Sequence, residues 1–298
     1  MTTQTTQTTQ TTTTTETTDP ADSTGPTRTV LITGTSSGIG LATAVTAARA
    51  GWHVIATMRD TAKADALLAA ADRAGATVDV RALDVTDPAS VEACLSGLDR
   101  LDALVNNAGA GHVGTLEQED VQDVRAVMEV NFFGVLHVTR AALPLLRASR
   151  GRVLTVTSVG GVIGQPFNEA YCAAKFAVEG FMESLAPVAA TVGVSVGVVE
   201  PGAVASEFVA NVGLAHDAEQ QAGPYAPALS AYLARTRDAF ANAQTPQDVA
   251  TRIVEWLTAT RPAFRLLTSD AARAFAATKL KDLDGSAVQT LTGGWVAP

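Results

Sequence analysis

Short apolar runs rich in β-branched residues recur along the chain, and most of them end at glycine, asparagine or aspartate. Five such runs are predicted as buried strands, at residues 29–33, 53–57, 78–83, 101–105 and 152–157. An Ala-rich segment at residues 41–50 has a helical composition, and Gly51 is placed to end it. A second helix is predicted to begin at Thr245, as N-cap, with Pro246 in the first helical position. Strand and helix signals that alternate in this way predict an α/β fold.

The N-terminal segment lacks this pattern. Residues 1–27 are mostly Thr and Gln and hold almost no apolar side chain. Because such a segment cannot offset its own ordering entropy, we predict a disordered tail there. Residues 28–298 run without a linker-like break and are long enough to bury one sizeable core, so one domain is predicted.

Charge and cysteine content narrow the function classes. The formal net charge of -9, without a basic stripe, argues against a nucleic-acid partner. The two cysteines, Cys94 and Cys172, make neither a disulfide framework nor a metal site. No secretory signal pattern is present, and no apolar stretch reaches the roughly 18 residues of a membrane span. We therefore expect a soluble cytoplasmic protein.

A glycine-rich turn follows the first predicted strand. It reads Gly34-Thr35-Ser36-Ser37-Gly38-Ile39-Gly40 and leads directly into the first predicted helix. Strand, glycine turn and helix are typical of the opening of a dinucleotide-binding fold, in which the pyrophosphate lies at the helix N-terminus. The glycine spacing differs from the common Gly-x-Gly-x-x-Gly fingerprint, so the turn alone also fits an ordinary strand–turn–helix unit.

The end of the second predicted strand bears on the choice of cofactor. An acidic residue about 20 positions past the turn would bind a ribose 2′-hydroxyl, but Met58 stands at about that place and Arg59 follows it. An arginine suits a 2′-phosphate because it forms charge-assisted, often bidentate, hydrogen bonds, and Ser36 and Ser37 could add donors. The sequence therefore favours NADP(H) over NAD(H). Two alternatives stay open: Arg59 is a solvated surface charge, or Asp60 reaches the ribose.

Polar and glycine residues also follow the third and fourth predicted strands. Asp84 and Val85 end the third, and Asn106-Asn107-Ala108-Gly109 follows the fourth. Because open parallel sheets bind ligands beyond the carboxyl ends of their strands, these residues are candidate ligand contacts. His112, a little further on, either faces the pocket or is a surface histidine.

A serine, a tyrosine and a lysine carry the candidate chemistry. Ser158 follows the fifth predicted strand, and Tyr171 and Lys175 lie at i and i+4 on one face of a predicted helix. A phenol with an ordinary pKa of about 10 is a poor base, but a lysine cation and a positive nicotinamide would lower that pKa. Ser158 could orient the same substrate oxygen. The pattern predicts hydride transfer with Tyr171 as acid/base; the alternative is that Tyr171 and Lys175 share a face by chance.

Together these pieces resemble the short-chain dehydrogenase/reductase family. The matching pieces are the glycine turn, Asp84-Val85, Asn106-Asn107-Ala108-Gly109, Asn131, Ser158, Tyr171-Cys172-Ala173-Ala174-Lys175 and Pro201-Gly202, in the family's order and spacing. The resemblance implies a single Rossmann-type, doubly wound α/β domain with seven mostly parallel strands and helices on both faces. It also implies a catalytic tetrad of Asn131, Ser158, Tyr171 and Lys175.

The family resemblance also assigns roles. Tyr171 would be the acid/base, Ser158 would hold the substrate oxygen, and Lys175 would bind the nicotinamide ribose and lower the tyrosine pKa. Asn131 would support a water that links Lys175 to solvent; without the family it equally fits a cap or turn. Asp84 and Val85 would contact the adenine, Asn107 the region near the ribose, and Val204 the carboxamide. Ser206 stands where the family usually has threonine. The implied cofactor contacts are Gly34, Ser36, Ser37, Gly38, Ile39, Gly40, Arg59, Asp84, Val85, Asn107, Ala108, Gly109, Tyr171, Lys175, Pro201, Gly202, Val204 and Ser206.

Residues 56–60, 164–171 and 176–181 resemble the hydroxysteroid and retinol dehydrogenase branch, which implies a bulky apolar alcohol or ketone as substrate. A lid is predicted at about residues 203–245. Its apolar side chains would line the site or only pack the lid onto the body: Phe208, Val209, Leu214, Tyr225 and Tyr232. Residues from about 271 to 298 resemble the C-terminal extension of the branch. The resemblance further implies a homodimer or homotetramer, formed through the helices that carry Asn131 and Tyr171.

Two other functions are weighed against this one. A 3-oxoacyl-thioester reductase would favour basic residues near its entrance, but the lid holds only Arg235 and Arg237 against Glu207, Asp217, Glu219 and Asp238. A non-catalytic NADP(H)-binding sensor would have lost the tyrosine or the lysine, and here the tetrad is intact.

Overall fold

The computed structural model describes residues 27–206 and 222–297 of the 298-residue chain. Apart from Thr27, the predicted N-terminal tail lies outside these residues, and so do Phe208, Val209 and Leu214 of the predicted lid.

Seven strands form one sheet in the order β3-β2-β1-β4-β5-β6-β7, and each neighbouring pair is parallel. The strands are β1 (Thr29–Thr33), β2 (His53–Met58), β3 (Asp79–Ala82), β4 (Ala103–Asn106), β5 (Arg152–Val156), β6 (Ser195–Glu200) and β7 (Arg265–Leu267). The strand order reverses between β1 and β4, which is the ligand-binding switch point of a doubly wound sheet. The Rossmann-type α/β fold is confirmed. The five strands predicted individually are present, with ends shifted by at most two residues, and all rather than most of the pairings are parallel.

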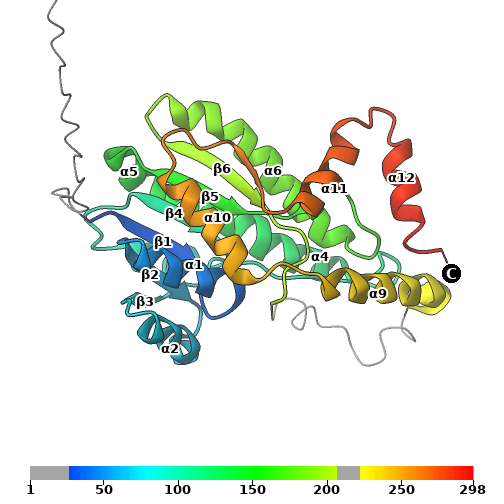
Figure 1. Ribbon diagram of the computed structural model, residues 1–298, viewed down its shortest axis with the longest axis horizontal. Helices are drawn as coiled ribbons and strands as arrows, with labels where there is room; N and C mark the ends of the chain where they lie inside the picture. The colour runs from blue at the N-terminus through cyan, green and yellow to red at the C-terminus, as the bar shows by residue number, and fades with distance from the viewer. Residues whose placement is uncertain (1–26, 207–221, 298) are drawn as a thin grey trace, which may run out of the picture.

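Helices cover both faces of the sheet (Figure 1). The first face holds α1 (Gly38–Arg49), α2 (Asp65–Arg73) and α10 (Pro246–Thr258), and the second holds α3 (Pro88–Leu95), α5 (Gly134–Ser149) and α6 (Glu169–Ala190). Because side chains alternate along a strand, β1 supplies both cores: Val30 and Ile32 pack on the first face and Leu31 on the second, all fully buried. Among the helices of the described ranges, none is long and apolar enough to cross a membrane.

Two predicted helix boundaries can be compared directly with the structure. The N-cap at Thr245 is confirmed: its hydroxyl accepts from the Asp248 N–H at 3.1 Å, and the Asp248 carboxylate accepts from the Thr245 N–H at 3.0 Å. The first helix begins at Gly38, three residues earlier than predicted, and ends at Arg49. Gly51 has φ +84°, the left-handed conformation that suits a glycine just past a helix end.

Three further helices of the described residues gather at one end of the molecule. α9 (Ala226–Ala241) lies in the predicted lid, and α11 (Asp270–Leu280) and α12 (Ser286–Gly293) belong to the C-terminal extension; Figure 1 shows the three beyond the sheet. The ring of Tyr232 in α9 lies 5.6 Å from that of Phe167, and its hydroxyl accepts from Asn168 Nδ2 at 2.7 Å. Tyr232 therefore packs the lid onto the body, whereas Tyr225 is 41% exposed.

Candidate active site

The glycine turn brings two backbone segments into close contact. Gly34 and Gly38 have φ values of +70° and +57°, which a residue with a side chain rarely adopts. A Cβ added to Gly40 would lie 2.1 Å from the Gly34 carbonyl oxygen. One added to Gly34 would lie 2.8 Å from the Cα of Ala108. Glycine is therefore required at these positions for the turn to pack against the loop after β4.

Asn107 fixes this turn in place. Its Nδ2 donates to the carbonyl oxygens of Thr33 at 2.8 Å and Gly34 at 2.9 Å. The backbone N–H groups of Asn107 and Ala108 both donate to the Thr33 hydroxyl at 2.9 Å. The side chain expected near the ribose thus ties the carboxyl ends of β1 and β4 together at the switch point.

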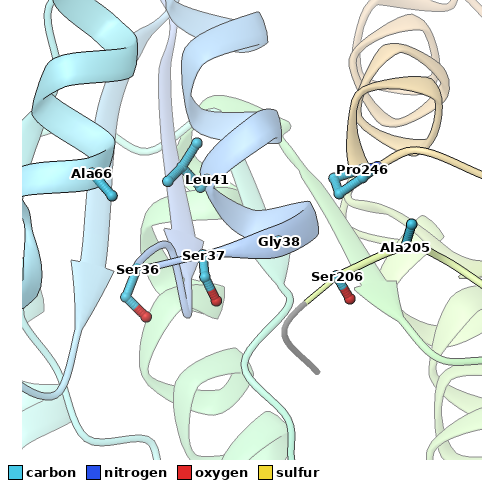
Figure 2. A pocket seen from close by; sticks show the side chains of 8 residues that line it. All are labelled: Ser36, Ser37, Gly38, Leu41, Ala66, Ala205, Ser206 and Pro246. Atoms are coloured by element: carbon cyan, nitrogen blue, oxygen red, sulfur yellow. The ribbon is translucent and has the colours of Figure 1, made fainter. Parts of the chain in front are cut away.

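A cavity of about 640 Å³ opens in front of the glycine turn (Figure 2). It is lined by Ser36, Ser37, Gly38, Leu41, Ala66, Ala205, Ser206 and Pro246. Ser37 is the N-cap of α1, but its side chain makes no capping hydrogen bond. The first N–H groups of the helix therefore receive no hydrogen bond from the N-cap side chain, and a helix N-terminus of this kind favours an anion. Turn and helix start together fit the pyrophosphate of a dinucleotide.

Three charged residues follow the carboxyl ends of β2 and β3: Arg59, Asp60 and Asp84. Arg59 is exposed, and Asp60 is the N-cap of the short helix η1 (Thr61–Lys63), its Oδ1 accepting from the Ala62 N–H at 3.0 Å. Burial raises the pKa of Asp84, but two hydrogen bonds from Thr86 and the charge of Arg59 outweigh that effect and hold the pKa below its usual value. Arg59 and Asp84 therefore lie close enough for the charge of the arginine to stabilise the ionised form of the aspartate.

The structure brings the four predicted catalytic residues together around two glycines. A Cβ on Gly160 would lie 3.3 Å from Cε1 of Tyr171 and 3.4 Å from Oγ of Ser158. A Cβ on Gly109 would lie 2.9 Å from Oδ1 of Asn131 and 3.5 Å from Nζ of Lys175. Ser158 also accepts from the Gly160 N–H at 3.0 Å, as N-cap of η3 (Val159–Gly161). A Cβ at Gly109 would have to displace Asn131, whereas one at Gly160 would make only tight contacts with Tyr171 and Ser158.

Asn131 lies in a π-helical turn, η2 (Glu129–Phe133), between α4 (Val121–Met128) and α5. It is fully buried. Its Nδ2 donates to the carbonyl oxygens of Ala110 at 2.9 Å and Val127 at 3.0 Å, and its Oδ1 accepts from the Ala110 N–H at 3.2 Å. Asn131 is therefore not a cap or a turn residue: it anchors the loop after β4 to a long helix. π-helical turns are rare and are often found at functional sites.

Burial sets the protonation of the tyrosine and the lysine. Lys175 is 4% exposed, its Nζ donates to the Val156 carbonyl at 3.1 Å, and burial lowers its pKa to about 8 although Glu179 opposes this. Desolvation of the hydroxyl raises the pKa of Tyr171 to about 12, against a hydrogen bond with Ser158. The lowered tyrosine pKa expected from the sequence depends on a positive nicotinamide as well as on the lysine, whose Nζ lies 5.7 Å from the ring centre; the protein's own groups raise the pKa.

The structure changes the interpretation of one residue near the site, His112, and adds another, Glu179. His112 is neither a free surface histidine nor a lone pocket residue, because its Nε2 lies 2.7 Å from Oε1 of Glu119. Glu179, which the sequence analysis did not single out, lies one helical turn after Lys175 and is 4% exposed. Its i+4 spacing from Lys175 was the signal that could have identified it.

Comparisons with known proteins agree with this geometry. The family profile that matches the chain, at residues 28–217, is described as short chain dehydrogenase. The chain is 41% identical over 271 residues to retinol dehydrogenase 8 of Bos taurus, with 87% of each chain covered. It is 39% identical over 269 residues to 17-beta-hydroxysteroid dehydrogenase type 1 of Mus musculus, covering 86% of this chain and 78% of that one.

Solved structures give the same result. A short-chain dehydrogenase from Streptomyces avermitilis aligns with a TM-score of 0.71 and 30% identity, over 91% of this chain and 98% of that one. A short-chain dehydrogenase/reductase from Burkholderia phymatum, solved in complex with NAD, aligns with a TM-score of 0.75 and 25% identity, over 87% and 95%. This chain belongs to the short-chain dehydrogenase/reductase family of oxidoreductases, in the branch that holds hydroxysteroid and retinol dehydrogenases.

Proposed function

We propose that the protein is an NADP(H)-dependent oxidoreductase that interconverts an alcohol and a ketone or aldehyde, with Tyr171 as the acid/base. The observation that carries the proposal is the clustering of Ser158 and Tyr171 about Gly160, and of Asn131 and Lys175 about Gly109, in the segments that follow the carboxyl ends of β5 and β4.

The cofactor fits the described residues. The uncapped start of α1 would hold the pyrophosphate, and the glycine turn lets the backbone approach it. Val204 is buried and bridges to Gln244, and Ser206 faces Ser36 and Ser37 across the cavity in Figure 2; both side chains are proposed cofactor contacts with Pro201 and Gly202. When bound, the nicotinamide would supply or accept the hydride.

The protein's own residues handle the proton. In reduction, the Tyr171 hydroxyl donates a proton to the substrate oxygen; in oxidation, the phenolate accepts it. Because burial raises the Tyr171 pKa to about 12, the protein by itself favours the proton-donating form. Positive charge close to the hydroxyl would be needed to favour the phenolate. Ser158 would hold the same substrate oxygen, and Lys175 would bind the ribose.

Arg59 supports the preference for NADP(H). It is exposed at the end of β2, and its charge reaches Asp84. The competing acid, Asp60, already uses one carboxylate oxygen to cap η1. An exposed guanidinium beside a carboxylate that already caps a helix suits a 2′-phosphate better than a 2′-hydroxyl.

The proposed substrate is a bulky apolar alcohol or carbonyl compound, in keeping with the names of the relatives. A 3-oxoacyl thioester on an acidic carrier protein is less favoured, because such a carrier would need basic residues near the entrance. One of the two arginines of the lid, Arg235, already packs against Trp295, with its guanidinium 4.6 Å from the ring centre. Residues 28–298 would act as one domain, with α9 in the lid and α11 and α12 in the C-terminal extension.

The proposed assembly is a homodimer or homotetramer formed through the α4–η2–α5 helix and α6. Three aromatic side chains on these helices, Phe133, Phe176 and Phe181, are 38–40% exposed. Exposed aromatic residues of this kind are enriched where protein surfaces associate.

A fluorescence titration with NADPH and NADH, followed by a screen of ketones and aldehydes, tests the proposal. Tighter NADPH binding together with turnover of bulky apolar ketones would support it. Tyr171→Phe should abolish turnover while cofactor affinity is largely kept, because the phenol serves the chemistry more than binding. Normal turnover by that variant would exclude the assigned mechanism, and tight NADPH binding without turnover across the panel would favour a sensor.

A further inference from the structure

A buried charge network lies directly behind the proposed catalytic residues. Three of its members adjoin a segment that carries part of the proposed site. Thr157 directly precedes Ser158, Glu179 follows Lys175 by one turn of α6, and Glu200 ends β6 just before Pro201. Arg265, at the start of the edge strand β7, reaches across to both glutamates.

The contacts are direct. Arg265 Nε donates to Oε1 of Glu200 at 2.9 Å, and its Nη2 donates to Oε2 of Glu179 at 3.5 Å and to Oε2 of Glu183 at 2.9 Å. Oγ1 of Thr157 lies 2.5 Å from Oε1 of Glu179 and 3.0 Å from the Val199 carbonyl oxygen. One arginine thus links β6, β7 and the helix that carries Tyr171 and Lys175.

The charges of this network do not balance when all its groups are ionised. Glu179 is 4% exposed and Glu200 is fully buried, whereas Glu183 is largely exposed. A single guanidinium cannot offset two buried carboxylates as well as contact a third, so one carboxyl group favours its neutral form. Burial raises the pKa of both Glu179 and Glu200, and that of Glu179 reaches about 7.

Hydrogen-bond geometry identifies Glu179 as the group that holds the proton. A threonine hydroxyl has one hydrogen to donate, yet Thr157 lies against two acceptors, the Glu179 carboxyl and the Val199 carbonyl oxygen. If Glu179 carries a proton, it donates to Thr157, and the threonine hydrogen is left for Val199. Both hydrogen bonds are then formed. Glu200, by contrast, has the closer contact with Arg265 and suits the ionised form.

We propose that Glu179 is a positioning residue that acts through Lys175: it holds a proton in contact with Thr157, and its ionisation stabilises the ammonium group of Lys175 one helical turn away. The charged or titratable groups that face Glu179 are Lys175 and Glu183 on its own helix, Glu200 from β6 and Arg265 from β7. Of these, Lys175 is the one that the proposed function places beside the cofactor and Tyr171. The inference rests on that function only for the importance of the lysine charge.

A lysine titration tests this inference without any substrate. The chain contains four lysines, Lys63, Lys175, Lys279 and Lys281, so the full-length protein labelled with ¹³C at lysine Cε gives a small set of signals. In Glu179→Gln, the Lys175 pKa should fall by about 0.5–1 unit, because a carboxylate no longer forms next to it. Glu183→Gln is the matched control: it makes the same change one turn further along α6, on the same arginine, and should leave the Lys175 pKa within about 0.2 unit.

The unsubstituted protein provides a second readout that does not depend on the variant folding. Its Lys175 signal should show a small inflection near pH 7, as Glu179 ionises, before its own titration. An unchanged Lys175 pKa in Glu179→Gln, an equal change in Glu183→Gln, or a single-step wild-type titration would each overturn the proposal. With an active substrate in hand, the alkaline limb of kcat for carbonyl reduction should move to lower pH in Glu179→Gln, with KM little changed. Because the lysine titration needs no turnover, an inactive protein with the expected Lys175 shifts would count against the proposed function alone.

Discussion

We predict that the buried Lys175 lowers the free energy of unfolding of this protein. It is 4% exposed, and burial lowers its pKa from 10.5 to about 8. The folded protein therefore binds the Lys175 proton more weakly than the unfolded chain does. At pH values where this lysine is protonated in both states, which means below about pH 8, the difference destabilises the folded protein. The difference of about 2.5 pH units, at about 1.36 kcal/mol per unit, corresponds to a cost of about 3 kcal/mol. Lys175→Met removes this cost and keeps most of the side-chain volume.

The substitution also removes the hydrogen bond from Nζ to the Val156 carbonyl, worth about 1 kcal/mol. At pH 7 the variant should therefore be more stable than the wild type by about 2 kcal/mol. As the pH rises from 8 towards 10.5, the unfolded chain keeps the lysine proton that the folded protein has lost, so the wild type gains stability. By pH 9.5 the two proteins should have nearly equal free energies of unfolding.

Urea unfolding at pH 7 and pH 9.5, followed by far-UV circular dichroism, measures the difference. Lys63→Met, at an exposed position, is the control and should change the free energy of unfolding by less than about 0.5 kcal/mol at either pH. A Lys175→Met variant that is less stable than wild type at pH 7, or a difference that does not change with pH, would refute the reasoning.

Three further substitutions test separate parts of the site. Arg59→Ala should weaken NADPH binding by about 10–100-fold and leave NADH binding nearly unchanged, since a charge-assisted contact is worth about 1.5–3 kcal/mol; equal losses in a fluorescence titration would remove the argument for NADP(H). Gly40→Ala would place a Cβ 2.1 Å from a backbone carbonyl oxygen, so we expect a loss of about 1–3 kcal/mol in thermal unfolding and weaker cofactor binding. Gly180→Ala, which meets no atom within 4 Å, is its control and should not destabilise the protein. Asn168→Ala removes the hydrogen bond to the Tyr232 hydroxyl that holds α9 and should raise KM several-fold with kcat unchanged, whereas an unchanged KM would show that this contact does not hold the lid.

Local patterns in the sequence predicted the parts of this protein that depend on neighbouring residues. The strand at residues 29–33 and the N-cap at Thr245 are confirmed because a run of β-branched and apolar residues and a capping residue are signals carried by neighbouring residues. Likewise, the i and i+4 spacing was enough to place Tyr171 and Lys175 on one helix. The resemblance to the family added Asn131, which no local signal distinguishes from a cap.

The features that were missed depend on tertiary structure. Arg265 lies 86 positions from Glu179, and no spacing rule joins an edge strand to a helix over that distance. That the protein's own groups raise the pKa of Tyr171 could not be predicted from the sequence, because desolvation depends on everything packed around the hydroxyl. Residues 129–133 contain no proline or glycine, and Gly134, which follows them, does not by itself indicate a π-helical turn.

Because of this π-helical turn, the number of residues between α4 and α5 matters for the proposed active site. A π-helical turn uses one residue more than an α-helical turn between the same two helix segments. Deleting one residue within Glu129–Phe133 would let α4 and α5 join as an unbroken α-helix with its backbone hydrogen bonds intact and both segments nearly in place, but it would change the direction in which the side chains of this turn point. The helix would survive the deletion, while the loop held by Asn131 would lose its anchor. Substitutions along this helix can therefore leave the proposed site intact, whereas the deletion of a single residue in this turn would not.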